Sequence, residues 1–266
     1  MQTRISCRFL QSFLLIFVGS TFLFSQNQPP ASDPRAVSFA SQSISALASG
    51  KAITDVALTG SVTWSGGAAP ETGTATLLAS GKSESRMSLL LPSGTRTEIR
   101  DASTGLPQGQ WIAESGKSGL YASQNCATDA VWFFPALGSL APSSSVVLAY
   151  VGQETRNGAA VQHIQSFLYQ TNLSGAGPSQ QPLSTMDFYL DAATLLPVAV
   201  TFNVHPDNNA STNLPTEVDF SSYQVLNGVA VPTHIQRSLQ GNVLVDITIS
   251  GAFFNTGLPL SDFAIN

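Results

Sequence analysis

The sequence predicts a mainly β, single-domain protein: a curled antiparallel sheet or incomplete β-barrel of roughly 10–11 strands, with an N-terminal helix and a short helical or loop lid. Apolar and polar residues alternate through most of the chain after Lys51, which is the period-two pattern of strands with one buried face. Turn dipeptides, above all Asn157-Gly158 and Asn227-Gly228, separate the alternating runs, as they do in β-hairpins. So many strands favour curling, because an open flat sheet would expose both of its edges.

The first 25 residues resemble a secretory signal peptide. Arg4 and Arg8 precede an interrupted apolar stretch over residues 9–24, which is too short and too broken for a typical membrane span. An uncleaved membrane anchor is the alternative. Cys7 lies before the apolar stretch rather than after it, so no lipid-attachment site is expected. We therefore expect a periplasmic or secreted protein that is not an integral membrane protein after signal cleavage.

Residues 26–32 are expected to form a linker, because they contain Pro29 and Pro30. Residues 33–266 form the predicted single domain. It begins with an amphipathic helix over residues 33–50, since Asp33 can cap the helix, Pro34 suits the first helical position and Gly50 suits the end.

Two segments break the alternation. Residues 173–182 are rich in Gly, Ser and Gln and are expected to form a loop. Residues 125–142 contain Trp132-Phe133-Phe134 followed by Pro135, and part of this segment can form one or two helical turns. Three adjacent aromatic residues cannot all face one side of a strand or helix. The segment is therefore either buried on several sides or a mobile apolar lid.

Composition excludes several functions. The chain has 16 acidic and 11 basic residues and a net charge of -5, so it lacks the basic surface that binds nucleic acid. Only 10% of its residues are charged, and 35 Ser and 22 Thr supply most of the polar surface. Removal of residues 1–25 takes away two arginines and leaves 9 − 16 = −7. It also leaves Cys126 as a single cysteine, which cannot form an internal disulfide and is expected to be a small buried side chain.

No catalytic or metal-binding motif is found, so we expect no enzyme activity, no catalytic residue, no metal and no cofactor. Gly-Lys-Ser occurs at Lys82 and Lys117 without the upstream glycine of a phosphate-binding loop. The three histidines, His163, His205 and His234, are far apart in sequence and are expected to be ordinary strand residues. Their convergence in a curled sheet, as in a hydrolase, is a weaker alternative.

The alternation predicts an apolar inner face. Met87, Leu89 and Leu91 point to one side of their strand and Arg86 and Ser88 to the other. Six aromatic residues of other strands are expected on the same inner face: Trp64, Trp111, Phe167, Phe202, Phe220 and Phe253. Such an interior either packs solid or encloses an apolar ligand. More than eight strands enclose more space than the inward side chains fill, so the N-terminal helix and Trp132-Phe133-Phe134 are the candidate plugs.

The chain resembles the superfamily of periplasmic lipoprotein carriers LolA and LolB, with the related LppX and RseB-type domains. The resemblance covers most of the mature chain and lies in its layout and in short C-terminal phrases: Phe188-Tyr189-Leu190-Asp191 through Leu196-Pro197, Val218-Asp219-Phe220-Ser221-Ser222-Tyr223, Asn227-Gly228-Val229-Ala230-Val231-Pro232, and Phe254-Asn255 with Leu260-Ser261-Asp262-Phe263. It implies an unclosed barrel whose concave apolar face, covered by helices, shelters acyl chains.

The resulting hypothesis is an exported carrier or sensor that binds a lipid or lipoprotein acyl chain. The candidate residues of its cavity or lid are Met87, Leu89, Leu91, Trp111, Trp132, Phe133 and Phe134. The alternatives are a non-catalytic envelope accessory protein with a filled core, acting through contacts with envelope proteins, and, more weakly, a hydrolase. A cavity of several hundred cubic ångströms would favour the carrier, and a solid interior would exclude it.

Overall fold

The computed structural model describes residues 30–81, 83–101, 107–128, 130–141, 143, 145–169 and 177–265. The predicted signal peptide and most of the predicted linker lie outside these residues. In the part of the chain that is described, no helix is long and apolar enough to cross a membrane.

The N-terminal helix α1 spans Pro34–Ala48, within the predicted range. The Asp33 carboxylate accepts a hydrogen bond from the Arg35 N–H at 2.7 Å, which satisfies a free donor at the start of the helix. Ser49 and Gly50 then turn the chain in the left-handed conformation. The buried face of α1 includes Ala36, Ala40 and Leu47, and this face contacts β7, β8 and β12 of the sheet described next.

Thirteen strands follow, compared with the roughly 10 or 11 expected. They are β1 (Asp55–Trp64), β2 (Glu71–Ser80), β3 (Glu84–Leu91), β4 (Gly94–Asp101), β5 (Gln108–Ile112), β6 (Ser118–Leu120), β7 (Val146–Arg156), β8 (Ala159–Leu168), β9 (Met186–Asp191), β10 (Pro197–Val204), β11 (Leu214–Leu226), β12 (Val229–Leu239) and β13 (Asn242–Phe254). The predicted Asn-Gly turns join β7 to β8 and β11 to β12. All four of their residues have positive φ angles, as a type I′ hairpin requires.

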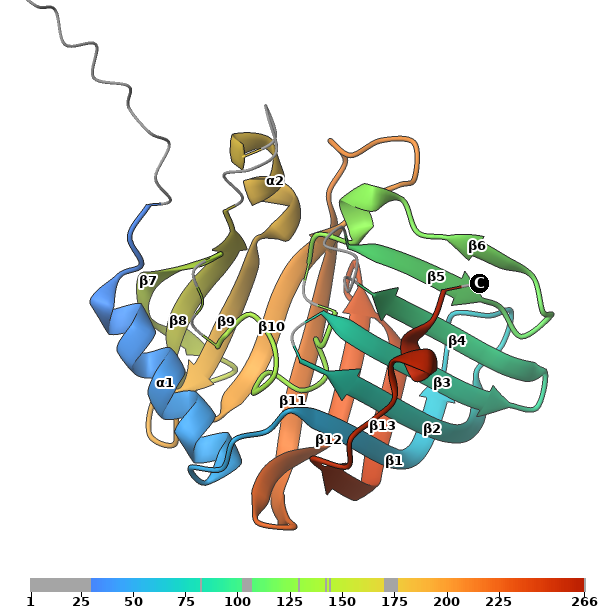
Figure 1. The fold of residues 1–266 in the computed structure, drawn as a ribbon, viewed down its shortest axis with the longest axis horizontal. Coiled ribbons are helices and arrows are strands. Elements are labelled where there is room, and N and C mark those ends of the chain that lie inside the picture. The colour runs from blue at the N-terminus through green and yellow to red at the C-terminus, as the bar shows by residue number, and fades with distance from the viewer. Residues whose placement is uncertain are drawn as a thin grey trace, which may run out of the picture.

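The strands form one antiparallel sheet in the order β6-β5-β4-β3-β2-β1-β13-β12-β11-β10-β9-β8-β7. Because β1 pairs with β13, the first and last strands lie in the middle, and β6 and β7, which follow each other along the chain, form the two edges. The sheet curls so that its two arms face each other without closing into a barrel (Figure 1). The predicted incomplete barrel is therefore confirmed.

The chain between the two edge strands, residues 121–145, is called the crossing segment. It begins with the short 3-10 helix η1 (Ser123–Asn125) and continues through successive turns, in which the Phe134 N–H donates to Val131 O and the Leu137 N–H to Phe134 O. No longer helix forms around Pro135 among its described residues. Phe133, Phe134 and Leu140 are almost fully buried in the main hydrophobic core, together with α1 and the inner face of the sheet.

Helix α2 spans Gly177–Ser184 and corrects part of the loop expected at residues 173–182; residues 173–176 lie outside the described chain. The Leu168 N–H donates to the Ser184 hydroxyl at 3.0 Å, and the Ser184 and Thr185 hydroxyls donate to Gln181 O. These contacts with β8 and within the last turn stabilise a helix whose composition alone favours a loop.

Phe253 is the clearest error in the predicted inner face, because its side chain is 56% exposed. The pairing of β1 with β13 shifts register at Thr59 and Gly60, opposite Gly251 and Ile249. Such a bulge reverses the alternation of the residues that follow it. Ala252 is therefore buried in the core and Phe253 points outward. Phe167 is buried, although it lies outside the main core cluster.

Candidate functional site

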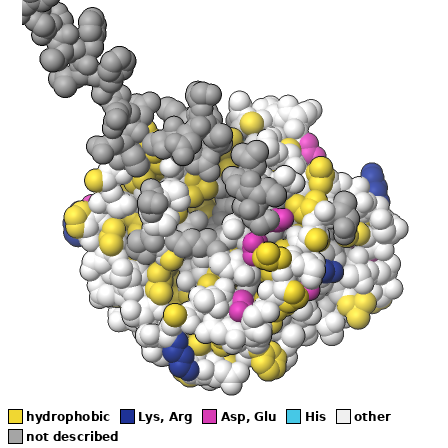
Figure 2. Space-filling model, viewed as in Figure 1, with side chains coloured by type: hydrophobic (Ala, Val, Ile, Leu, Met, Phe, Trp, Pro, Cys, Tyr) yellow, Lys and Arg dark blue, Asp and Glu magenta, His cyan; other side chains and the backbone are white. Residues whose placement is uncertain are grey.

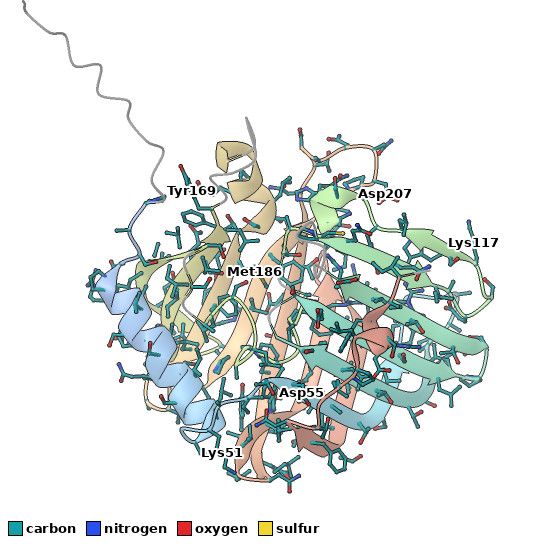
Figure 3. All side chains as sticks on the ribbon, in the orientation of Figure 1. Lys51, Asp55, Lys117, Tyr169, Met186 and Asp207 are labelled. Atoms are coloured by element: carbon teal, nitrogen blue, oxygen red, sulfur yellow. The ribbon has the colours of Figure 1, made fainter. Side chains whose placement is uncertain are left out.

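A cavity of about 400 Å³ lies between the two arms of the sheet. Its walls come from β3, β4 and β5 on one arm, from β10 to β13 on the other, and from the crossing segment between them. Exposed Asp207, on the loop after β10, is at its rim; Figure 3 labels this residue. The apolar and aromatic lining residues are Met87, Trp111, Tyr121, Trp132, Phe133, Phe202, Val204, Leu239 and Leu244, and the polar or charged ones are Ser85, Glu98, Arg100, Asn125, Thr128, His205, Asp207, Thr216, Arg237 and Ser238.

A buried ion pair joins the two arms across this cavity. The two terminal nitrogens of the Arg237 guanidinium, Nη1 and Nη2, donate to the two carboxylate oxygens of Glu98 at 2.9 and 3.0 Å. Arg237 is on β12 and Glu98 is on β4. The side chains are only 14% and 15% exposed. Burial by itself raises the pKa of Glu98, but the positive charges of Arg237, Arg96 and Arg100 outweigh it and hold that pKa below its usual value. Glu98 is therefore an anion at neutral pH, and we call this pair the clasp.

The inner face of β4 is charged, contrary to the expected wholly apolar inner face. The cross-strand pairs Met87–Glu98 and Leu89–Arg96 place these charged side chains on the inner side. The buried Ile99 lies on the outer side of β4, where the 3-10 helix η2 (Leu260–Phe263) packs against β3 and β4. Because the C-terminal segment covers the outer face, β4 can bury its apolar residue there and point its charges inward.

Arg100 differs from the other two arginines on this wall. Arg96 has Glu98 and Glu114 within 3.8 and 3.6 Å, and Arg237 has Glu98. Nε of Arg96 and Nη1 of Arg100 are both buried without a hydrogen-bond partner among the described residues. Arg100 differs in that its polar neighbour is the Cys126 thiol rather than a paired carboxylate.

The position of the Arg100 guanidinium is set by its neighbours on β5 and the crossing segment. It stacks on the ring of Tyr121 at 5.0 Å. A side chain at Gly109, its cross-strand partner, would come within 2.9 Å of Arg100 Cδ and 2.8 Å of the Tyr121 ring. The missing side chain at Gly109 therefore leaves room for the stack. Burial raises the pKa of Tyr121 well above its usual range, so its phenol stays neutral.

Aromatic rings form the apolar part of the cavity. The indole of Trp111 lies against Gly119, the opposite residue on β6, where a Cβ atom would be only 2.8 Å from the indole. Trp132 packs edge-on against Phe133, with ring centroids 5.4 Å apart, and its indole lies 4.9 Å from the Arg237 guanidinium. The clasp thus also positions part of the crossing segment.

His205 lines the cavity at the end of β10. Its backbone N–H donates to the Asn125 side chain and its carbonyl accepts from the same amide, each at 2.7 Å, which fastens η1 to β10. The His205 ring is 3.0 Å from Thr212 O through Nδ1. A carbonyl only accepts hydrogen bonds, so Nδ1 carries the proton. The other ring nitrogen, Nε2, is buried and has no partner among the described residues.

Four of the seven residues expected to bind ligand lie on the cavity wall: Met87, Trp111, Trp132 and Phe133. Leu89, Leu91 and Phe134 are instead buried in the main core. The polar lining residues were missed, although Glu98 and Arg100 share one face of their predicted strand. Cys126 is buried and free, as expected, and burial raises the pKa of its thiol.

The three histidines do not converge. His163 on β8 and His234 on β12 are four strand positions apart, or roughly 19 Å along the sheet. His163 lies on the outer face, where its two nitrogens contact Glu154 at 2.6 Å and Asp187 at 2.8 Å. Burial alone lowers the pKa of His163, but these two carboxylates outweigh it and raise that pKa. Among the described residues, no group of three His, Cys, Asp or Glu could hold a metal ion.

Ser221, His234 and Asp246 form a chain of hydrogen bonds across β11, β12 and β13, at 3.1 and 2.9 Å. These side-chain types also make up serine hydrolase triads. However, the three residues do not line the cavity described above, and His234 and Asp246 are about one third exposed. Gln236 also donates to Asp246 at 2.6 Å. The arrangement is that of a polar ladder on the outer face of a sheet.

The face of the molecule drawn in Figure 2 agrees with the low charge of the sequence. Figure 2 shows hydrophobic side chains dispersed among uncharged polar ones, with few lysines and arginines.

No protein-family model matches the sequence, and no curated protein matches it. Three solved structures are similar in fold. A domain described as an outer membrane lipoprotein-sorting protein from Vibrio parahaemolyticus has a TM-score of 0.56 and 15% identity, over 86% of this chain and 96% of that one. A DUF1329 family protein from Desulfovibrio piger has a TM-score of 0.56 and 12% identity, over 88% and 98%. A LolA superfamily protein from Nitrosomonas europaea has a TM-score of 0.53 and 10% identity, over 86% and 97%. The chain therefore has the fold of the LolA superfamily, as the resemblance of the sequence implied.

Proposed function

We propose that this protein is a carrier or sensor of the cell envelope that holds an acyl chain of a lipid or lipoprotein in the cavity between the arms of its sheet. The observation that carries the proposal is the cavity itself, with a volume of about 400 Å³ and walls that include Trp111, Trp132 and Phe133. Binding pockets for small molecules have volumes of about 300–1,000 Å³, so this cavity suits one chain rather than several.

The chemistry of the cavity wall suits binding better than catalysis. Each methylene that leaves water for an apolar wall contributes about 0.8 kcal/mol, so several methylenes suffice for stable binding. Holding a chain in this way requires shape and apolar area but no reactive group. The role is therefore proposed to be non-catalytic.

Export to the envelope is part of the proposal. It rests on the composition of residues 1–25 and on the likeness in fold to a domain described as lipoprotein-sorting. Residues 33–266 are proposed to be the working domain, preceded by a short linker.

The test is native mass spectrometry of protein purified from its own envelope, followed by displacement of any retained lipid with a fluorescent fatty acid. Leu244→Trp fills part of the cavity, and Val243→Trp is its matched control, because Val243 is the neighbouring residue on β13 and is 42% exposed. We expect Leu244→Trp to weaken lipid retention and Val243→Trp to leave it unchanged, with similar thermal stability. Wild-type protein that neither retains lipid nor binds the fatty acid would refute the proposal.

A filled-core accessory protein is the second candidate. One observation favours it: the crossing segment fills the interior beside α1, where Phe134 and Leu140 are fully buried. In that case both tryptophan variants would behave alike, and the protein would be purified without lipid.

A further inference from the structure

We propose that the ligand is an anionic amphiphile, whose negatively charged head group is bound by Arg100 while its chain lies against the aromatic residues of the cavity. This inference rests on the proposed function and specifies its ligand class. Its basis is the buried Nη1 of Arg100, which has no hydrogen-bond partner among the described residues although it lines the cavity.

The charged groups of β4 and β12 beside Arg100 are already paired with opposite charges. Asp207, at the rim of the cavity, is an exposed carboxylate. Both oxygens of Glu98 are engaged by Arg237 in the clasp. Arg96 lies between Glu98 and Glu114. The charge of Arg100 acts to lower the pKa of Glu98, and its charge and hydrogen bond act to lower the pKa of the Cys126 thiol. Arg100 nevertheless has no ion pair with a carboxylate among the described residues. Arg100 is thus the cation on this wall that is left to bind an incoming anion.

The guanidinium is also held in place before a ligand arrives. Tyr121 stacks on it, and the absence of a side chain at Gly109 makes room for that stack. A cation that is already oriented loses little conformational entropy when it binds an anionic oxygen. A buried donor without a partner is costly, and an acceptor from the ligand would remove that cost. Arginine suits carboxylate and phosphate oxygens in particular, because its N–H groups form a planar fork.

A second buried atom on the cavity wall, Nε2 of His205, also lacks a hydrogen-bond partner among the described residues. Because Nδ1 of the His205 ring donates to Thr212 O, Nε2 is the ring nitrogen left to contact a ligand. A hydroxyl of the head group would satisfy it.

Trp111, Trp132 and Phe133 offer apolar surface to the chain within the same cavity. Trp111 is the cross-strand neighbour of Glu98, and the Trp132 indole lies 4.9 Å from the Arg237 guanidinium. The cavity therefore places aromatic surface beside charged groups, so that one amphiphile can contact both.

The test compares cis-parinaric acid, a fluorescent fatty acid, with its uncharged methyl ester at pH 8, where the free acid is ionised. We expect wild-type protein to bind the acid at least about tenfold more tightly than the ester, the effect of a charge-assisted hydrogen bond. Arg100→Gln should lose this preference while binding the ester as wild type does. Arg86→Gln, the control on the outer face of β3, should retain it, because Arg86 contacts Ser88 and Asp262 O instead.

Equal and measurable binding of the acid and the ester by wild-type protein would overturn this inference and leave the proposed function standing. Binding of neither probe would overturn the proposed function itself. An equal loss of both probes in Arg100→Gln would show that Arg100 only supports the structure, and would also overturn the inference. Displacement of the acid by millimolar inorganic phosphate alone would identify a site for free anions and exclude an amphiphile.

Discussion

The clasp between Glu98 and Arg237 gives the sharpest prediction about stability. Glu98→Gln keeps the size of the side chain but removes its charge, which leaves a buried guanidinium with no anion bound to it in bidentate geometry. The partners are only 15% and 14% exposed, so solvent does little to compensate. Removing one partner of a buried pair costs about 3–5 kcal/mol of unfolding free energy. In a chain of this size, each kcal/mol of lost stability lowers the melting temperature by about 2–4 °C. We therefore expect the melting temperature of Glu98→Gln to be roughly 6–20 °C below that of wild type.

A double variant distinguishes the stability lost with the ion pair itself from the cost of leaving one buried charge unpaired. Glu98→Gln/Arg237→Met replaces the cation with an apolar side chain of similar length, and apolar replacements of buried pairs are often neutral. We expect it to recover much of the lost stability. Recovery should stay incomplete, because Trp132 loses its cation–π contact, worth about 0.5–2 kcal/mol.

The assay is urea unfolding followed by tryptophan fluorescence and circular dichroism at pH 7. Because the pair is buried, the loss in Glu98→Gln should change little with salt concentration. A Glu98→Gln variant within about 1 kcal/mol of wild type would refute the reasoning. So would a double variant whose loss equals the sum of the two single losses, since coupled partners are not additive.

The pH dependence provides an internal check on the same pair. The pKa of Glu98 is lower in the folded protein than its usual value of 4.5. Ionised Glu98 therefore stabilises the fold fully at pH values above the pKa that it has in the unfolded chain. This stabilisation is lost as the pH falls through the lower pKa of Glu98 in the folded protein. The difference in stability between wild type and Glu98→Gln should shrink on acidification below about pH 4.5.

Four further substitutions test other parts of the fold. In wild type, protonated His163 stabilises the fold fully below about pH 6.5, and this stabilisation is lost as the pH rises through the higher pKa of His163 in the folded protein. His163→Gln should remove it. The difference in urea midpoint between wild type and this variant, measured from pH 5 to 9, should therefore fall with increasing pH. Gly119→Ala places a methyl group 2.8 Å from the indole of Trp111, so it should shift tryptophan emission and weaken fatty-acid binding. Asp33→Ala should cost about 1 kcal/mol in urea unfolding through the lost cap. Phe134→Ala, at a fully buried position, should cost about 3–5 kcal/mol in the same assay, and a cost below 1 kcal/mol would show that the core beside α1 is not well packed.

Local signals predicted the elements of the fold. Asp33-Pro34 marks the start of α1 because one residue can cap the helix and the next suits its first position. Asn157-Gly158 and Asn227-Gly228 mark hairpins because both residues tolerate positive φ angles. These signals act within a few residues, so no knowledge of distant contacts is needed.

Features that depend on distant contacts could not be predicted in this way. Glu98 and Arg237 are 139 residues apart. Nothing near Glu98 in the sequence shows that its strand points its charges inward, because that direction depends on the packing of η2 against the outer face. The outward position of Phe253 depends on a bulge in the pairing of β13 with a strand nearly 200 residues earlier. Four of the seven predicted site residues therefore lie on the cavity wall, and its charged residues were missed.

One connection explains why the interior is filled at one end and hollow at the other. Because β6 and β7 lie at opposite edges of the sheet, the chain that joins them must cross between the arms. Near α1 this crossing segment meets apolar side chains and packs solidly against them. Toward β4 and β12 it meets the clasp and Arg100, and apolar side chains cannot fill that space without burying charge beside them. The cavity lies beside these charged groups, and we expect a ligand larger than about one chain to displace Trp132 and Phe133 before it enters.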